Sequence, residues 1–296
     1  MSDQPPLQTG LLERRMGDWA RHWLPPVLRD AILFVLKQGW AALFGGLLLG
    51  AALLTRVLWQ PGWPVHRYDA LFLFAIVVQL LFLALKLETW TEARVIVLFH
   101  LTGTAMEWFK VRVGAWGYPE PCFFRVMDVP LFSGFMYASV GSYMARAIRI
   151  FDMRFIPYPP FWQTFGLALL IYINFFSHHF IPDLRYALFM GTLVVYGRTM
   201  IHFRITQRDW WMPLPLAAFL SSVALWIAEN VCTTSGIWRY AGQHGHQMVS
   251  FSKMGSWYLL LYVAFMTVTL LGRDRFYLTA KGRSANSGQR VGIWSR

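Results

Sequence analysis

Eight apolar runs dominate this chain, and each is long enough, or nearly so, to cross the hydrocarbon core of a bilayer. A core about 30 Å thick needs roughly 20 residues of α-helix at 1.5 Å per residue. The runs occupy residues 39–59, 68–87, 93–111, 129–148, 162–181, 184–203, 210–231 and 252–271. The pattern predicts an all-α membrane protein with about eight transmembrane helices. The third run also contains His100, Glu107 and Lys110, and seven helices would remain if it did not span.

The shortage of charged residues supports a bilayer environment. Charged residues make up 14% of the chain and hydrophobic residues 56%, whereas about 25% of the residues of a soluble domain are charged. A chain of this composition cannot cover a large water-facing surface, so we expect membrane lipids around most of it.

The basic residues lie mostly on one side of the predicted topology. The net charge is +12, a balance that in other chains indicates nucleic-acid binding. Here nineteen of the 27 Lys and Arg residues fall in the termini and the even-numbered loops, which share one side of an eight-span protein. The positive-inside rule places that side in the cytoplasm. We therefore expect two cytoplasmic termini and no nucleic-acid partner.

The chain divides into four segments. They are a cytoplasmic N-terminal segment, two transmembrane repeats and a basic, disordered cytoplasmic tail, at residues 1–38, 39–150, 151–271 and 272–296. Within the first, residues 11–24 are a candidate interfacial helix that ends at Pro25 and Pro26. The tail is rich in Gly and Ser, a composition typical of disorder.

The division into repeats rests on a shared motif, Glu-x6-Gly-x-Trp-x-Tyr. Its two copies consist of Glu107, Gly114, Trp116 and Tyr118, and of Glu229, Gly236, Trp238 and Tyr240. Equivalent residues are offset by 122 positions, and the same offset carries the first two apolar runs onto the fifth and sixth. Because the offset covers an even number of spans, both copies keep one orientation. The sequence predicts two parallel four-helix repeats related by a pseudo-twofold axis along the membrane normal.

Glu107 and Glu229 are the candidate catalytic residues. Each follows apolar and small residues close to the end of its span. A carboxyl group at such a depth faces the protein interior or a cavity by default, because its insertion costs roughly 2.5–3.5 kcal/mol. A pair of buried acids can donate and accept protons. In the alternative interpretation, Glu107 pairs with Lys110 one turn later and Glu229 binds loop backbone, so that each only fixes a helix end.

Four aromatic residues of the motif are candidate substrate-binding residues: Trp116, Tyr118, Trp238 and Tyr240. An apolar ring with a polar tip suits the membrane–water interface, and this is the simpler interpretation. In the other interpretation the four side chains wall an apolar pocket above the two acids.

The remaining polar and conformational signals lie around the same motif. Lys110 and Asn174 are polar groups within predicted spans, and we include both among the candidate substrate-binding residues because a buried polar group needs a partner. Gly114 and Gly236 are predicted to take a left-handed conformation in a turn after each acid.

The histidines offer only a weak metal site, and we expect no cofactor. The candidates are His178, His179, His244 and His246, together with Glu229. Adjacent interfacial histidines are more often solvated or hydrogen-bonded. Phosphate-cradling loops, nucleophile elbows and Cys-x-x-Cys motifs do not occur in the sequence.

The two cysteines, Cys122 and Cys232, fall on the predicted non-cytoplasmic side. A disulfide is chemically permitted there. Two free thiols are the favoured interpretation, because spacing alone fixes no geometry.

The residues from Thr104 to Glu120, with Val129-Pro-Leu-Phe-Ser-Gly-Phe-Met-Tyr137 downstream, resemble a bacterial membrane family. This family is catalogued as domain of unknown function 817, the YoaT-like proteins. The resemblance extends from about the first to the eighth apolar run. It implies a multi-pass protein of the bacterial inner membrane, and it brings no activity with it.

A shorter stretch, mainly residues 107–137, is similar to the integral-membrane carotenoid hydratases and, through them, to the membrane lycopene cyclases. The shared pattern is Glu-x6-Gly followed by aromatic residues and Val-Pro-Leu. It implies cofactor-independent protonation or hydration of an isoprenoid double bond, with Glu107 and Glu229 as the acids. This chain departs from that pattern, because it has Gly-Ala-Trp-Gly-Tyr where those enzymes tend to have Phe, Pro and Tyr.

Three functions follow from these signals. The first is acid/base chemistry on an isoprenoid or other lipid at the paired Glu residues. The second is secondary transport, which is less well supported because the span centres are almost wholly apolar apart from His100 and Asn174. The third is a non-catalytic scaffold or sensor in which the motifs lock helix pairs. The sequence reveals neither the substrate nor the oligomeric state.

Overall fold

The computed structural model describes residues 25–60, 62–206, 208–242 and 247–271. The predicted interfacial helix at 11–24 and the predicted tail at 272–296 lie outside this part of the chain.

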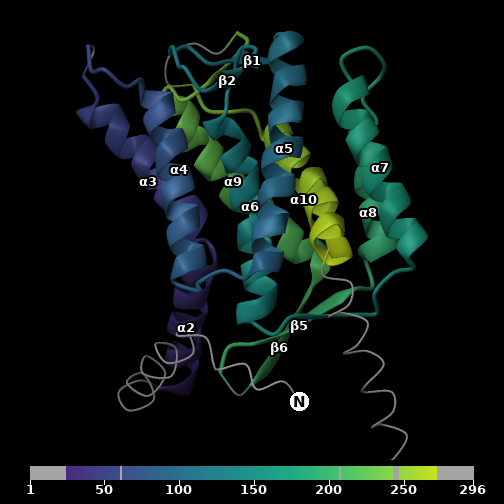
Figure 1. Ribbon diagram of the computed structural model, residues 1–296. Coiled ribbons are helices and arrows are strands. Elements are labelled where there is room, and N and C mark those ends of the chain that lie inside the picture. The colour runs from purple at the N-terminus through teal and green to yellow at the C-terminus, as the bar shows by residue number, and fades with distance from the viewer. Residues whose placement is uncertain (1–24, 61, 207, 243–246, 272–296) are drawn as a thin grey trace, which may run out of the picture.

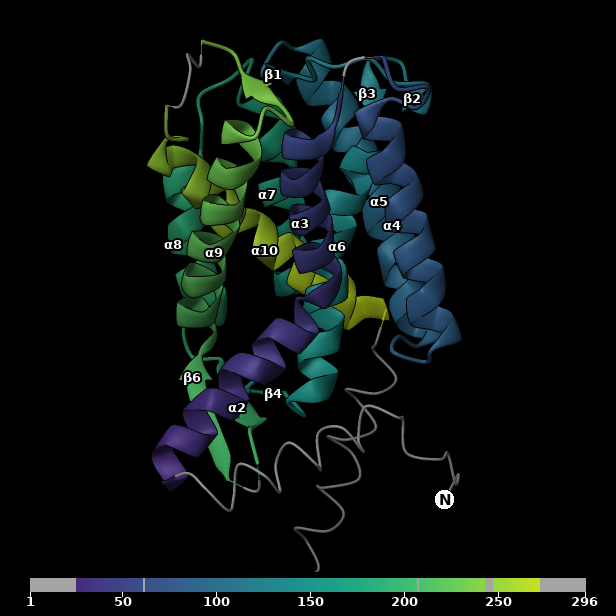
Figure 2. The same cartoon turned by 90° about the vertical axis from the view of Figure 1, so that its left-hand side faces the viewer.

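The described residues form a bundle of helices that run up and down between two ends (Figure 1). The helices are α2 (Pro26–Ala41), α3 (Leu43–Leu58), α4 (Arg67–Ala84), α5 (Trp90–Arg112), α6 (Phe132–Ile150), α7 (Phe161–Ser177), α8 (Arg185–Tyr196), α9 (Leu214–Thr234) and α10 (Phe251–Leu271). Helices α6 and α10 lie inside the bundle, where they pack on their neighbours from both halves of the chain (Figure 2).

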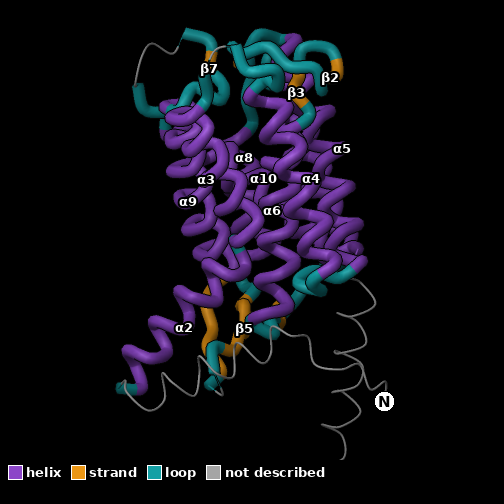
Figure 3. Tube along the Cα trace, turned by 60° about the vertical axis from the view of Figure 1, so that its left-hand side comes forward, coloured by secondary structure: helices purple, strands orange, loops and turns teal. Residues whose placement is uncertain are grey.

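Short strands mark the two ends of the bundle. At the first, here called the motif end, lie β1 (Trp116–Gly117), β2 (Arg125–Val126), β3 (Val129–Pro130) and β7 (Arg239–Tyr240). At the opposite end, here called the sheet end, β4 (Arg154–Ile156), β5 (Met200–Arg204) and β6 (Asp209–Pro213) form an antiparallel sheet in the order β4-β5-β6. Figure 3 shows β2, β3 and β7 at one end of the helices and β5 at the other.

Several helices are suited to a bilayer. By length and composition α4, α9 and α10 could each cross a membrane. The residues Leu28–Ala41 and Leu43–Leu58 pass the same test as a pair that is bent by 70°. Helix α7 is apolar but shorter. Each of the eight predicted ranges contains a helix, but the 12 residues of α8 extend only about 18 Å.

The prediction of an all-α fold is wrong at the sheet end. The predicted sixth span continues to residue 203, but α8 ends at Tyr196 and the chain forms β5. Along β5 burial alternates, with Ile201 and Phe203 inside, the pattern expected of a strand with one buried face. The predicted seventh span begins with β6, because Pro213 disfavours helix at the residue before it.

A helix precedes the first predicted span. The sequence predicts a cytoplasmic segment at residues 1–38 and a first span from residue 39, whereas α2 starts at Pro26, a proline in the first turn where its missing N–H costs nothing. Leu33 and Ala41 of α2 are buried in the core cluster that also contains Phe151 and Phe203. This burial fixes a helix where the sequence shows no long apolar run.

Candidate functional site

The ends of α5 and α9 are built alike. Helix α5 stops at Arg112 and α9 at Thr234, which are equivalent positions of the repeat. Two residues later Gly114 and Gly236 have φ values of 70° and 69°. The backbone hydrogen bonds that close the two turns also coincide. The prediction of a left-handed glycine after each acid is therefore confirmed, because a side chain would be strained there.

The turns lead into β1 and β7, which pair with each other across the motif end. Trp116 lies opposite Tyr240, and Gly117 lies opposite Arg239, in an antiparallel pair. Gly117 and Arg239 are themselves equivalent, since they are offset by the same 122 residues as the two Glu residues. The two copies of the motif are thus in direct contact.

Glu107 is held by three aromatic donors. Its Oε2 accepts hydrogen bonds from Trp116 Nε1 at 2.6 Å and from Tyr118 Oη at 2.7 Å. Its Oε1 accepts from Tyr137 Oη at 2.7 Å. The residue is 3% exposed, and the described part of the chain places no cation within 4 Å of its carboxylate. The ion pair with Lys110 considered above is not formed.

Glu229 is held in a similar way by two donors. Tyr240 Oη donates to its Oε1, and Trp257 Nε1 donates to its Oε2 at 2.9 Å. Glu229 is 5% exposed. Both donors are side chains, and within the described residues no backbone N–H of the loop donates to this carboxylate, unlike in the alternative interpretation.

The donors of the two acids form one aromatic cluster. The rings of Trp116 and Tyr240 are 5.6 Å apart between centroids, edge to face. The rings of Tyr137 and Trp257 are 6.1 Å apart. In each of these two pairs, one ring belongs to a donor of Glu107 and the other to a donor of Glu229. The two carboxylates therefore share a single environment.

Tyr118 and Tyr240, which follow α5 and α9 in the chain, are protonated donors to the two acids. Burial raises the pKa of Tyr118 well above its ordinary value of 10, and the charge of Glu107 raises it further. Burial and the charge of Glu229 raise the pKa of Tyr240 in the same way. Both hydroxyl groups therefore keep their protons at any physiological pH.

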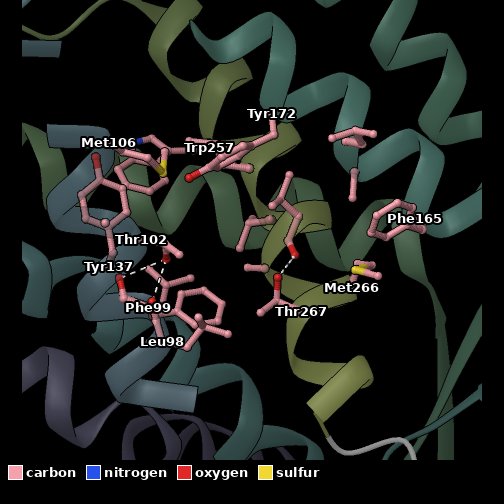
Figure 4. A pocket seen from close by; sticks show the side chains of 18 residues that line it. Leu98, Phe99, Thr102, Met106, Tyr137, Phe165, Tyr172, Trp257, Met266 and Thr267 are labelled. Carbon is pink, nitrogen blue, oxygen red and sulfur yellow. Dashed lines mark hydrogen bonds between the residues drawn. The ribbon is translucent and has the colours of Figure 1, made fainter. Parts of the chain in front are cut away.

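An apolar cavity of about 290 Å³ adjoins this cluster. Its walls come from α5, α6, α7 and α10, and Tyr137 and Trp257 form part of them (Figure 4). Phe165 and Leu169 of α7 also line it and are each 47% exposed, so the cavity is open at the side of the bundle. Its size is close to the lower end of the range of small-molecule sites, roughly 300–1,000 Å³.

The four motif aromatics do not line this cavity. Trp116, Tyr118 and Tyr240 contact the acids, as described above. Trp238 is buried in a cluster with Tyr68 and Phe132, and it does not repeat the role of Trp116. The wall of the cavity nearest the acids is formed instead by Tyr137 and Trp257.

Lys110 and Asn174 face other partners. Lys110 Nζ donates to the carbonyl oxygen of Phe175 at 2.7 Å and lies 2.8 Å from Nε2 of His179. Asn174 Nδ2 donates to Asp183 at 3.0 Å, and its Oδ1 accepts from the backbone N–H of Leu184 at 2.9 Å. Asn174 therefore fixes the turn between α7 and α8 and does not line the cavity.

The described histidines contact groups other than metal ligands, and the two cysteines are not paired. His178 and His179 stack with ring centroids 4.2 Å apart, and His178 Nδ1 lies 2.9 Å from the carbonyl oxygen of Asn174. Among the residues that the structure describes, no three His, Cys, Asp or Glu side chains gather as metal ligands. His244 and His246 lie outside that part. Cys122 and Cys232 are free thiols, packed at the same cluster as Trp238.

Sequence reasoning missed Tyr137, Trp257 and Gly103. Tyr137 follows Glu107 by 30 residues and Trp257 follows Glu229 by 28, so a gapless alignment does not pair them. Gly103 permits the contact, because a Cβ atom there would lie 2.6 Å from the Cβ atom of Tyr137. The signal available was Gly103 itself, a small residue one turn before Glu107.

Comparisons with known proteins agree with the resemblance noted in the sequence. The family described as "Protein of unknown function (DUF817)" matches residues 30–265. The chain is 37% identical over 245 residues to the "Uncharacterized protein YoaT" of Bacillus subtilis (strain 168), covering 82% of this chain and 92% of that relative. No solved structure matches the chain. The similarity to carotenoid hydratases and lycopene cyclases stays a prediction, because neither match concerns those enzymes.

Proposed function

Since the chain belongs to the DUF817 family, which is defined by sequence and not by an activity, we propose a function from the geometry of its site. The protein is a multi-pass protein of the bacterial inner membrane, built as two parallel four-helix repeats with both termini in the cytoplasm. At Glu107 and Glu229 it carries out cofactor-independent proton chemistry on a lipid-like molecule, with an isoprenoid as the leading candidate.

The surface of the bundle supports a lipid environment. Large apolar side chains are exposed on most of the outer helices, among them Val57 of α3, Leu80 of α4, Leu170 of α7, Val194 of α8 and Leu220 of α9. Soluble monomers rarely expose apolar patches of this extent. In a bilayer the same side chains contact acyl chains, so their exposure has no free-energy cost.

The pairing of β1 with β7 supports the two repeats. A twofold axis that relates two segments makes them antiparallel where they meet, with equivalent residues opposite each other. Gly117 and Arg239 satisfy this condition. The matched ends of α5 and α9 add a second local agreement.

One observation carries the proposed chemistry: Tyr137 Oη is bonded to Glu107 while Tyr137 also lines the apolar cavity. A hydroxyl group can both donate and accept, so it can pass a proton from a protonated carboxyl group to a molecule in the cavity. The indole of Trp257 is a donor only and cannot relay a proton. Glu107 is therefore the proton source, and Glu229 the fixed negative charge on the other side of the aromatic cluster.

The reaction balances without an oxidant or a metal. The π electrons of a carbon–carbon double bond form a new C–H bond with the proton of Tyr137, which recovers a proton from Glu107 and leaves a cation in the cavity. Loss of a proton from a neighbouring carbon, or from a water that adds to the cation, returns the proton to the carboxylate of Glu107. The charge of Glu229 stabilises the cation between these steps.

A purely structural role is the second candidate. Trp116, Tyr118 and Tyr240 come from the loops after α5 and α9, so each carboxylate also holds its own loop against a helix end. This arrangement would lock the two repeats together in a scaffold or sensor without any turnover.

Comparison of lipid extracts tests the two candidates. Cells with the wild-type protein, without it, and with Glu107→Gln, Glu229→Gln or Tyr137→Phe are analysed by mass spectrometry, and each purified variant is checked for thermal unfolding. Proton relay predicts a wild-type product that is lost in Glu107→Gln and Tyr137→Phe. The matched control is Tyr186→Phe, because Tyr186 is 77% exposed on α8.

Two results would decide against the enzyme. Unchanged product in both Glu variants would dismiss proton chemistry at these residues. Identical extracts with and without the protein, together with a lowered unfolding temperature in the Glu variants, would establish the structural role.

A further inference from the structure

Two lysines lie on the helix faces that line the cavity. Each is one turn closer to the motif end than a residue of the cavity wall. Lys110 follows Met106 on α5 by four residues, and Lys253 precedes Trp257 on α10 by four residues. Met106 and Trp257 both line the cavity. Residues four apart lie on the same face of a helix, and α5 runs toward the motif end while α10 runs away from it. Both lysines therefore lie above the same end of the cavity.

Lys110 is a buried basic side chain held by neutral groups. Its Nζ donates to the carbonyl oxygen of Phe175 at 2.7 Å and lies 2.8 Å from His179 Nε2. It also lies 4.0 Å from the centroid of the Phe175 ring. These contacts hold the ammonium group at the end of α7, and one of its three N–H donors is left for a further partner.

The side chain of Lys253 packs against two rings of the aromatic cluster. Its Nζ is 4.3 Å from the ring centroid of Tyr240 and 5.8 Å from that of Trp116. In the described ranges neither Lys253 nor Lys110 has a carboxylate within 4 Å. The nearby acids are already bound: Glu107 and Glu229 to the aromatic donors, and Asp183 to Arg185 at 2.6 Å.

A second hollow lies beside the cavity. It has a volume of about 340 Å³ and is lined by residues of α5, α7 and the turn after α7, among them Phe109, Tyr172 and Phe180. Tyr172 lines the cavity as well. Phe109 precedes Lys110, and its ring centroid is 6.2 Å from that of His179. The Phe109 ring, whose centroid is also 6.0 Å from Lys110 Nζ, therefore places the hollow near the Lys110–His179 pair.

We propose that this region is a binding site for a lipid with one apolar chain and an anionic phosphate headgroup. The chain occupies the cavity and the hollow, and the phosphate is bound between Lys110 and Lys253. An ammonium group binds phosphate as a point charge, and a charge-assisted hydrogen bond is about twice as strong as a neutral one. The inference deepens the proposed function, because it places a prenyl phosphate with its double bonds beside Tyr137.

Equilibrium binding of radiolabelled farnesyl phosphate to the purified full chain in detergent micelles tests the site. Farnesol serves as the probe without the charge, and inorganic phosphate as the probe without the chain. Lys253→Gln should weaken farnesyl phosphate binding by about tenfold, the loss of one charge-assisted hydrogen bond, and leave farnesol binding unchanged. Lys110→Gln is a second variant, used if it unfolds like wild type.

Lys86→Gln is the matched control, because Lys86 is exposed in the turn between α4 and α5 at the other end of the bundle. It should bind like wild type. Equal affinity for farnesol and farnesyl phosphate, or full affinity in Lys253→Gln, would overturn the headgroup site. Tight binding of inorganic phosphate alone would show that a free phosphate and not a lipid is recognised.

The binding assay involves no turnover, so its outcome is separable from that of the proposed function. Lipid extracts that do not change, combined with charge-dependent binding, would remove the chemistry and keep the site. A product that depends on Glu107, combined with equal binding of farnesyl phosphate and farnesol, would keep the chemistry and remove the headgroup site.

Discussion

Gly117 and Arg239, which hold the same position in the two copies of the motif, lie opposite each other in the β1–β7 pair. The two copies of the motif therefore form one of the contacts between the halves of the molecule. This contact places both acids at one end of the bundle, on either side of a single aromatic cluster, and it can be tested without knowledge of any substrate.

A disulfide should form between cysteines at positions 117 and 239. Residues directly opposite in an antiparallel pair have Cβ atoms about 4.5–5.5 Å apart, close to the separation in a disulfide. With Cys122 and Cys232 replaced by Ser, the variant Gly117→Cys/Arg239→Cys should cross-link under mild oxidation and migrate faster on a non-reducing gel. Gly117→Cys with Arg204→Cys, at the sheet end, is the negative control. Cross-linking in that control alone would contradict the register.

Gly103→Ala should separate Tyr137 from Glu107. The added Cβ atom would lie 2.6 Å from the Cβ atom of Tyr137, which cannot move away without moving α6. Overpacking of this kind costs about 1–3 kcal/mol of unfolding free energy. We expect a lower unfolding temperature in detergent and loss of any product that depends on Tyr137. Gly50→Ala on α3 is the control, because no atom lies within 4 Å of its added Cβ; an equal effect there would refute the steric argument.

Removal of the Tyr118 hydroxyl should destabilise the protein only while Glu107 is a carboxylate. Tyr118→Phe deletes a hydrogen bond to a buried carboxyl group, which contributes about 1.5–3 kcal/mol when that group is ionised. A double-mutant cycle with Glu107→Gln, followed by denaturant titration in micelles, should show positive coupling between the two sites. Additive effects would mean that the 2.7 Å contact contributes nothing. The exposed Tyr186 again provides the Tyr→Phe control.

The ion pair between Arg146 and Glu88 should be essential to folding at the sheet side of the bundle. Both side chains are completely buried, with Nη1 and Oε1 3.7 Å apart, and Gln79 and Ser142 also donate to Glu88. Arg146→Met leaves an unpaired buried carboxylate, at a cost of about 3–5 kcal/mol. Most of that loss should return in Arg146→Met/Glu88→Gln.

The exposed pair between Arg204 and Asp209 supplies the comparison for this experiment. It has a shorter distance, 2.7 Å, but both side chains are about half exposed. Its loss in Arg204→Met should lower the stability far less than Arg146→Met does, because solvent screens the charges. Similar losses in the two single variants would show that burial does not control the strength of these pairs.

Local features of this protein were readable from its sequence. Apart from α2, the helices coincide broadly with the apolar runs, because the hydrophobic pattern of each run is local. Gly114 and Gly236 adopt their predicted conformation, because a left-handed position after a helix is decided within a few residues. The resemblance to the family likewise depended on contiguous motifs.

Spacing along the chain does not predict which polar groups bind each other when residues from other helices compete for them. Lys110 lies one turn from Glu107, which suggested an ion pair, yet its ammonium group binds the end of α7 and Glu107 binds aromatic donors. In the same way α8 gives way to β5 because β4 and β6 are available to pair with it.

The sequence by itself determined the two acids, their turns and the apolar segments that carry them, since these depend on neighbours along the chain. Only the tertiary structure decided what the acids touch. Tyr137 and Trp257 reach them from helices about 30 residues away, and the cavity exists because α5, α6, α7 and α10 leave space between them. Hydrogen bonds and cavities of this kind depend on how helices pack, a property that no single stretch of sequence encodes.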